Sequence, residues 1–328
     1  MFVKRGLIGG RVAWPPCFHG YLTGDPSMTL RASLKTLCIA GLLAFMAPLA
    51  AEEVSQKLDG LTVAGNMEMA AGKSFKDGVV LITHGTLAHN RMELIKTLQN
   101  SLKAQGYNSL AINLSLGLDR RASAMYDCPT PHVHRHEDAV AEIGAWTQWL
   151  KGKGATRIAL MGHSRGGNQT AWALAEKDDP AYTAAVLIAP QTWEAGYHLK
   201  DYKARYKADL KPLLAKAEKL VTEGKGDTLI DMDFIYCEKT RAAARSVVSY
   251  YRDDPRMNTP TLLKQVKKPV LVIIGSADST VKGLPSMMAK VADGKLIKAY
   301  TVDGADHLFM DLYADEVVEQ AVKFIGWK

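Results

Sequence analysis

Hydrophobic and polar positions follow two alternating patterns over most of residues 78–328. Short continuous apolar runs predict strands that are buried on both faces of a sheet, and they lie at residues 78–83, 108–114, 158–161, 181–190, 269–275 and 296–302. Between these runs, apolar residues recur every three or four positions, which predicts helices with one buried face. These segments are residues 90–105, 136–150, 168–177, 284–291 and 314–327. This order predicts an α/β fold with a mostly parallel sheet and helices on both faces.

Two segments depart from this rhythm. Residues 53–76 are polar with short alternating stretches, which predict an antiparallel hairpin at the edge of the sheet. Residues 191–265 contain Lys- and Ala-rich helical stretches at 202–223 and 239–252, with no convincing strand between them. We therefore predict one domain over residues 52–328, with a helical lid inserted at about residues 191–265.

Residues 28–51 have the three parts of a secretory signal peptide. Arg31 and Lys35 form a short positive region, an apolar run follows from residue 37, and small residues precede Glu52. The run is shorter than the roughly 20 residues that a membrane span needs. We therefore expect an exported protein, periplasmic or secreted, without a stable membrane span; a retained membrane anchor is the alternative. Residues 1–27 show no usable pattern, and we expect a disordered, non-native extension.

The composition is that of an ordinary globular protein, with 47% hydrophobic and 23% charged residues. The formal net charge is +7, but a net charge of +4 lies in residues 1–51, so the remainder gives no reason to expect a nucleic-acid partner. The lysines between residues 200 and 219 are most simply a solvated helical face. Their alternative role is contact with a membrane or an anionic substrate.

Cys128 and Cys237 are the cysteines that remain after residue 51. One pair in an exported chain favours a disulfide, and two unpaired thiols are the alternative. His132, His134 and His136 alternate along a loop without an acidic or cysteine partner at a fixed spacing. This is a weak metal signal, so we expect no metal and no cofactor.

The sequence Gly-His-Ser-Arg-Gly at residues 162–166 lies between a predicted strand and a predicted helix. Strand, G-x-S-x-G and helix together form a nucleophile elbow, whose tight turn holds the serine in a strained conformation. The small residues two before and two after the serine keep strand and helix from colliding. We therefore predict that Ser164 is a nucleophile.

A serine hydroxyl needs a base, and the base needs an orienting acid. Asp278 follows the predicted strand 269–275, and His307 follows the predicted strand 296–302. The order Ser, Asp, His along the chain is that of a hydrolase triad. We predict Asp278 as the acid and His307 as the base.

A tetrahedral intermediate also needs hydrogen-bond donors aimed at its oxyanion. Arg165, directly after the serine, offers its backbone N–H, and Thr86 offers a second from the loop after strand 78–83. We expect His84, two residues before Thr86, to be structural rather than a second base.

From about residue 78 to its end, the chain resembles the α/β-hydrolase fold superfamily. The resemblance rests on the His-Gly loop at residues 84–85, the Gly-His-Ser-x-Gly elbow and the Gly-x-x-Asp loop at residues 275–278, and it covers roughly three-quarters of the sequence. The chain is most similar to the esterase, monoacylglycerol-lipase and S33-peptidase-like branch. The resemblance implies the α/β-hydrolase fold, with Ser164, Asp278 and His307 as triad.

These features predict an exported serine hydrolase that cleaves a small-molecule carboxylic ester through an acyl-enzyme. A serine peptidase or acyltransferase would share the triad and is the first alternative. The second alternative is a non-catalytic binding protein on the same fold. The sequence predicts neither the identity of the substrate nor the oligomeric state.

Overall fold

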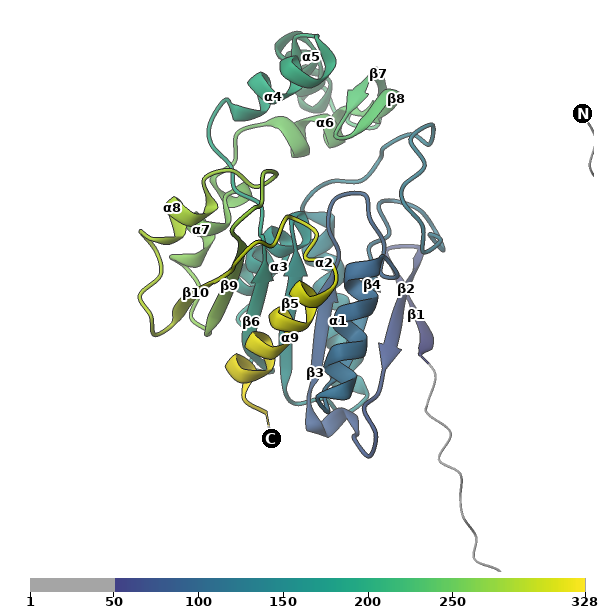
Figure 1. Cartoon of the computed structure of the whole chain (residues 1–328). Helices are drawn as coiled ribbons and strands as arrows, with labels where there is room; N and C mark the ends of the chain where they lie inside the picture. Colours follow the sequence, from purple (N-terminus) through teal and green to yellow (C-terminus); the bar gives the residue numbers. More distant parts are fainter. Residues whose placement is uncertain (1–50, 328) are drawn as a thin grey trace, which may run out of the picture. The chain divides into compact units, whose positions relative to one another are not determined.

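The computed structural model describes residues 51–327 (Figure 1). The predicted extension at residues 1–27 and the predicted signal peptide, apart from its last residue, lie outside the described residues. No helix in the described part of the chain is long and apolar enough to cross a membrane.

The centre of the structure is an eight-stranded sheet with the order β1-β2-β4-β3-β5-β6-β9-β10. Its strands are β1 (Glu52–Leu58), β2 (Leu61–Glu68), β3 (Val79–Thr83), β4 (Asn108–Asn113), β5 (Ile158–His163), β6 (Tyr182–Ile188), β9 (Val270–Gly275) and β10 (Ile297–Val302). β1 and β2 form an antiparallel hairpin at one edge, and every pair from β4 to β10 is parallel. The predicted edge hairpin and the predicted parallel sheet are both confirmed.

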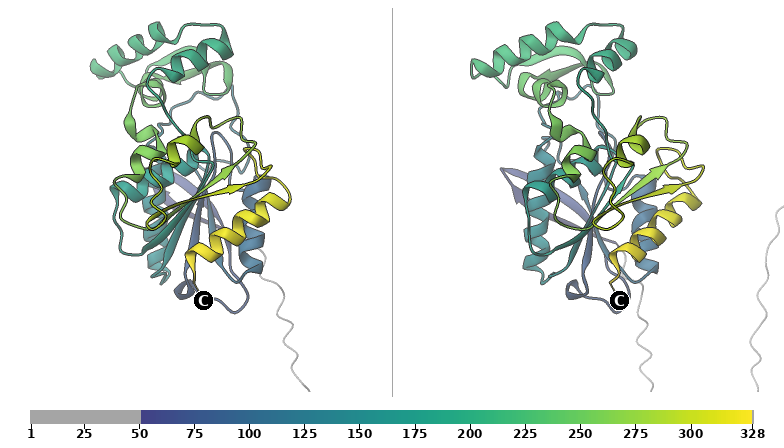
Figure 2. Two further views of the ribbon diagram at one scale, coloured as in Figure 1. Left: turned by 60° about the vertical axis from the view of Figure 1, so that its left-hand side comes forward. Right: turned by 90° about the vertical axis from the view of Figure 1, so that its left-hand side faces the viewer.

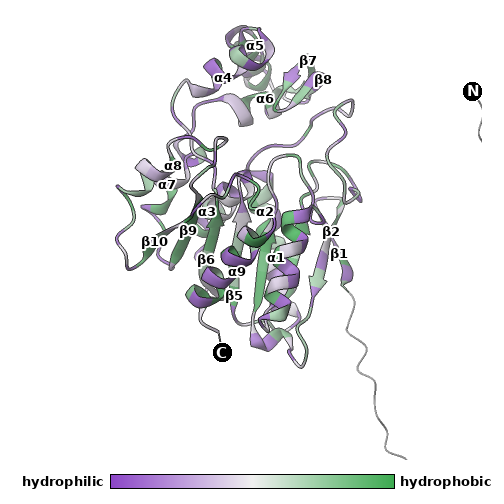
Figure 3. Ribbon diagram, in the orientation of Figure 1, coloured by the Kyte–Doolittle hydropathy of each residue, from purple (hydrophilic) through white to green (hydrophobic). Residues whose placement is uncertain are grey.

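Helices cover both faces of this sheet because neighbouring strand residues point to opposite sides. In β3, Val80 and Ile82 belong to the apolar cluster beneath α1 (Glu93–Ala104) and α9 (Leu312–Ile325). Leu81 belongs to the cluster beneath α2 (Asp138–Gly152) and α3 (Arg165–Glu176). Figure 2 shows α1 and α9 on one side of the sheet and the teal helices on the other. The central strands are almost entirely hydrophobic (Figure 3), as burial on both faces requires.

A separate group of elements lies above the carboxyl ends of the parallel strands (Figure 1). This lid consists of α4 (Tyr197–Tyr206), α5 (Leu210–Thr222), β7 (Leu229–Phe234), β8 (Cys237–Ala243) and α6 (Ala244–Tyr251). Below it lie two short helices: α7 (Thr259–Leu263) precedes β9, and α8 (Leu284–Met288) follows it.

The prediction of a lid without strands is wrong, because β7 and β8 pair as an antiparallel hairpin. β7 alternates strictly, with Ile230, Met232 and Phe234 buried and Leu229 and Asp231 exposed. The predicted helix at 239–252 is correspondingly too long, since the chain is extended up to residue 243. The Lys-, Arg- and Ala-rich composition of β8 favours a helix locally, but pairing with β7 overrides that preference.

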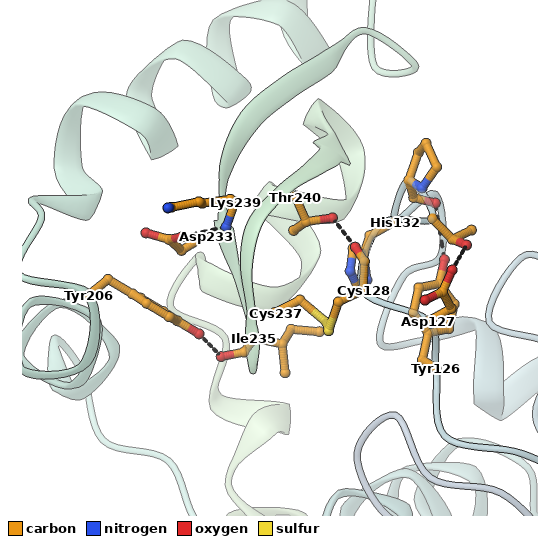
Figure 4. The surroundings of a disulfide bond; sticks show 12 residues. Tyr126, Asp127, Cys128, His132, Tyr206, Asp233, Ile235, Cys237, Lys239 and Thr240 are labelled. Atoms are coloured by element: carbon orange, nitrogen blue, oxygen red, sulfur yellow. Dashed lines mark hydrogen bonds between the residues drawn. A yellow bond between two sulfur atoms is a disulfide. The ribbon is translucent and has the colours of Figure 1, made fainter.

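Cys128 and Cys237 form a disulfide that joins the loop after β4 to the first residue of β8 (Figure 4). Hydrogen bonds lie on both sides of it. Thr240 donates its hydroxyl to the carbonyl of Cys128, and His132 exchanges backbone hydrogen bonds with Arg241 and Ala243. The chain enters and leaves the lid at two points, and the disulfide therefore adds a third covalent connection between the lid and the sheet domain.

Reduction of this disulfide should lower the melting temperature. The bridge spans 109 residues, and in the chain-entropy model a loop of that length restricts the unfolded state by about 4–5 kcal/mol. For a domain of this size that corresponds to a fall on the order of 10 °C, measurable by calorimetry with and without reductant. The double variant Cys128→Ser/Cys237→Ser is the control, because its melting should not respond to reductant. Identical melting of oxidised and reduced wild type would contradict the expectation.

Candidate active site

Ser164 lies at the turn between β5 and α3, with φ 57° and ψ −122°. A positive φ is unfavourable for a residue with a side chain and costs on the order of 1–3 kcal/mol. β5 ends directly before Ser164 and α3 begins directly after it, so both hold the residue in place. Ser164 also lines the large pocket beneath the lid.

Two glycines make this turn possible. A Cβ on Gly162 would lie under 3.0 Å from the carbonyl of Gly166 and from the hydroxyl of Thr170. A Cβ on Gly166 would lie equally close to the backbone of Thr83 and His84. Strand, helix and the neighbouring loop therefore approach each other at distances that only glycine allows.

The structure brings Ser164, His307 and Asp278 into one hydrogen-bonded line. Ser164 Oγ lies 2.9 Å from His307 Nε2, and His307 Nδ1 lies 2.9 Å from Asp278 Oδ2. Because a carboxylate only accepts hydrogen bonds, Nδ1 carries the proton and Nε2 is left to accept from the serine hydroxyl. The three side chains come from the ends of β5, β9 and β10, as the sequence predicts.

Asp278 is held in its charged form. Burial alone would raise the pKa of its carboxyl group, but hydrogen bonds from His307 and from the backbone N–H groups of Val281 and Thr280 outweigh that effect. The pKa therefore lies below its usual value. The carboxylate accordingly stays ionised at neutral pH, where it accepts the hydrogen bond from Nδ1 that defines the tautomer described above.

His163 also helps to hold His307 in place, a role that the sequence analysis missed. Its Nε2–H donates to the backbone carbonyl of His307 at 2.8 Å, and the two rings lie 4.9 Å apart. Burial lowers the pKa of His163 to about 4, so the ring stays neutral. The signal in the sequence is the position of His163 directly before Ser164, but the carbonyl to which it donates lies 144 residues further along the chain.

Thr86 and Arg165 line the same pocket as Ser164. The side chain of Arg165 donates from Nε to Thr86 Oγ1 at 3.1 Å, so the two residues predicted to supply backbone N–H groups are also joined through their side chains. His84, by contrast, points away into the core. It is buried and accepts a hydrogen bond from Leu114 N at 3.1 Å, as expected of a structural histidine.

The three alternating histidines are bound to one another and to neighbours, not arranged around a point. His132 and His134 share a hydrogen bond of 3.2 Å, and His134 bonds the hydroxyl of Tyr250 at 2.8 Å. His136 faces Asn168 and Arg165. Within residues 51–327, no group of three or more His, Cys, Asp or Glu side chains has an arrangement that could hold a metal ion.

The pocket has a volume of about 870 Å³ and lies between the carboxyl ends of the strands and the lid. Ser164, Thr86 and Arg165 line its sheet side, and aromatic residues of the lid line much of the remainder. The tyrosine hydroxyls of Tyr202 and Tyr206 are bonded to backbone carbonyls of the β7–β8 hairpin. These tyrosines therefore offer ring surfaces rather than hydroxyls to a bound molecule.

The parallel sheet, the elbow serine and the Ser-His-Asp line together define an α/β hydrolase. The model of the alpha/beta hydrolase family matches residues 79–320. The chain therefore belongs to this family. No curated protein matches the chain significantly in sequence.

Solved structures of low sequence identity share the fold. Est1E from Butyrivibrio proteoclasticus with ferulic acid bound has a TM-score of 0.61 at 18% identity, covering 83% of this chain and 99% of its own. An esterase from Pyrococcus furiosus has a TM-score of 0.55 at 18% identity, covering 85% and 91%. The alpha/beta hydrolase GrgF from a Penicillium species has a TM-score of 0.61 at 14% identity, covering 84% and 98%.

Substitution of Gly166 by alanine should disrupt the elbow. The added methyl group has no free space against the backbone of Thr83 and His84, so we expect a loss of several kcal/mol of stability or failure to fold. Thermal melting measures the effect. Gly152→Ala is the matched control, because an added Cβ there meets nothing within 4 Å, and equal melting of the two variants would show that the elbow tolerates a side chain.

Proposed function

We propose that the protein is a serine hydrolase that cleaves carboxylic esters through an acyl-enzyme intermediate. The observation that carries the proposal is the line from Ser164 to His307 to Asp278, with both hydrogen bonds at 2.9 Å. Such a line is what activates a hydroxyl that is otherwise a weak nucleophile.

In the proposed reaction, Ser164 Oγ attacks the ester carbonyl while His307 Nε2 takes the hydroxyl proton. The charged carboxylate of Asp278 stabilises the imidazolium that results. His307 then returns the proton to the departing alcohol, and the acyl group stays on Ser164. Water, deprotonated by the same nitrogen, attacks the acyl-enzyme and releases the acid.

Thr86 and Arg165 are the proposed donors for the oxyanion of each tetrahedral intermediate. Arg165 is the first residue of α3, so its backbone N–H is not used within the helix. The hydrogen bond between their side chains supports the proposal, because it fixes the loop after β3 relative to the start of α3. One such donor is typically worth about 3–4 kcal/mol of transition-state stabilisation.

Two observations support esters as substrates and export as the destination. Two proteins that share the fold support the first point. The Pyrococcus furiosus protein is named an esterase, and Est1E has a structure with ferulic acid bound. The disulfide Cys128–Cys237 is typical of proteins that leave the reducing cytosol. A peptidase or acyltransferase would use the same triad and differ in the acceptor, and a binding protein would not react at Ser164.

Ser164→Ala should abolish covalent labelling by a fluorophosphonate probe that labels the wild type. The probe phosphonylates only a serine whose proton is removed by a neighbouring base. A series of 4-nitrophenyl esters of increasing chain length, compared with aminoacyl amides, then tells ester from amide hydrolysis. Equally weak labelling of wild type and variant would exclude a serine hydrolase and favour a non-catalytic binding protein on the same fold.

Asp278→Asn should lower kcat by about 10⁴-fold while leaving the fold intact. Asparagine can donate to His307 Nδ1 and so favours the wrong tautomer, which leaves Nε2 protonated and unable to accept from Ser164. Ester hydrolysis and circular dichroism measure the two effects. Asp303→Asn is the control, since Asp303 directly follows β10 but accepts a hydrogen bond from Ser276; an equal loss in both variants would argue against the triad.

A further inference from the structure

Arg165 carries a charge that the described protein does not balance. It lines the pocket beside Ser164 and is only partly exposed. Its neighbours are the hydroxyl of Thr86, a ring nitrogen of His136 and the ring of Tyr250, whose centroid lies 5.0 Å from the guanidinium carbon. None of these groups is an anion, and within residues 51–327 Arg165 forms no ion pair with an aspartate or glutamate. Partly buried charges are normally paired.

The neutrality of His136 follows from its own contacts. Asn168 donates from Nδ2 to the carbonyl of Arg256 and to Thr259, so its Oδ1 accepts from His136 Nε2–H. His136 Nδ1 is then a lone pair that accepts from Arg165 Nη1 at 3.1 Å. Complete burial, with the charge of Arg165 as a second cause, lowers the pKa of His136 to about 3. The histidine orients the guanidinium without cancelling its charge.

The guanidinium is also incompletely bonded. Nε donates to Thr86 and one N–H of Nη1 donates to His136, while the remaining N–H groups on Nη1 and Nη2 have no acceptor among the described residues. Arg121 provides the contrast. It is buried and uses both terminal nitrogens on an asparagine oxygen and three backbone carbonyls.

The pocket holds a second arginine with different surroundings. Arg205 also lines the cavity, but it forms an ion pair with Asp201 at 3.5 Å and lies over the ring of Tyr236. Its charge is therefore already paired with a carboxylate of α4. Arg165 differs because no carboxylate of residues 51–327 pairs with it and because it is the residue next to the proposed nucleophile.

We propose that Arg165 is a specificity-determining residue that binds a carboxylate of the substrate, so that the preferred esters are anionic. The inference rests on the proposed function, because the carboxylate belongs to the molecule that Ser164 attacks. Three of the five N–H groups remain free, and two of them match the two oxygens of a carboxylate. A substrate carboxylate close to the scissile bond would supply the missing counter-ion, and this holds whether the acyl part or the alcohol part carries it.

The test compares charged and neutral esters of the same size. For the acyl part, mono-4-nitrophenyl adipate is compared with its methyl ester, methyl 4-nitrophenyl adipate. For the alcohol part, 4-acetoxybenzoate is compared with 4-acetoxybenzamide. We expect wild type to prefer the charged member of at least one pair in kcat/KM, and the responding pair identifies which part of the substrate faces Arg165.

Arg165→Gln should reduce that preference by about 10- to 100-fold, as expected for the loss of a hydrogen-bonded ion pair. Arg165→Lys keeps the charge and should retain part of the preference. Arg205→Gln should leave the preference for the charged ester intact, because the charge of Arg205 is already paired. High salt should weaken the preference of wild type.

Two outcomes would overturn the inference. One is that wild type shows no preference in either pair; the other is that Arg165→Gln slows charged and neutral esters equally, which would limit the side chain to holding Thr86. Failure of the proposed hydrolase is a different result, since no ester would then be cleaved and Ser164 would not be labelled by the fluorophosphonate.

Discussion

The backbone of Ser164 sets the constraint on which the rest of the site depends. A serine at φ 57° can be held between a strand and a helix only if both come very close to it. Gly162 and Gly166 make that approach possible, and the loop at His84 completes the contact. The same closeness brings Thr86 beside Arg165 and places His163 where it can bond His307. One strained residue thus fixes the relative positions of three loops.

The lid reaches this centre through aromatic and imidazole side chains. Tyr250 of α6 lies under the guanidinium of Arg165 and bonds His134. His134 in turn bonds His132, whose backbone pairs with β8. These alternating histidines, which give only a weak metal signal in the sequence, therefore serve as neutral links between the lid and the residue after Ser164. Burial keeps the pKa values of all three far enough below neutrality for these links to remain uncharged.

The sheet and the positions of Ser164, Asp278 and His307 could be predicted because each depends on local pattern. Strands buried on both faces are continuous apolar runs, and these three side chains follow them within a few residues. The β7–β8 hairpin could not be predicted as easily, because distant partners stabilise it. Tyr202 and Tyr206 bond its backbone, and Cys128 is tied to its second strand. The role of His163 was hidden for the same reason, since its acceptor lies 144 residues away.

The disulfide also determines how the molecule would respond to a protease. The exposed residues 223–225 between α5 and β7 lie inside the ring closed by Cys128 and Cys237, and exposed loop tips are preferred cleavage sites. A single cut there would produce two polypeptides that remain covalently linked. One would carry Ser164 and the other Asp278 and His307, so a nicked molecule would retain all three groups until the bridge is reduced.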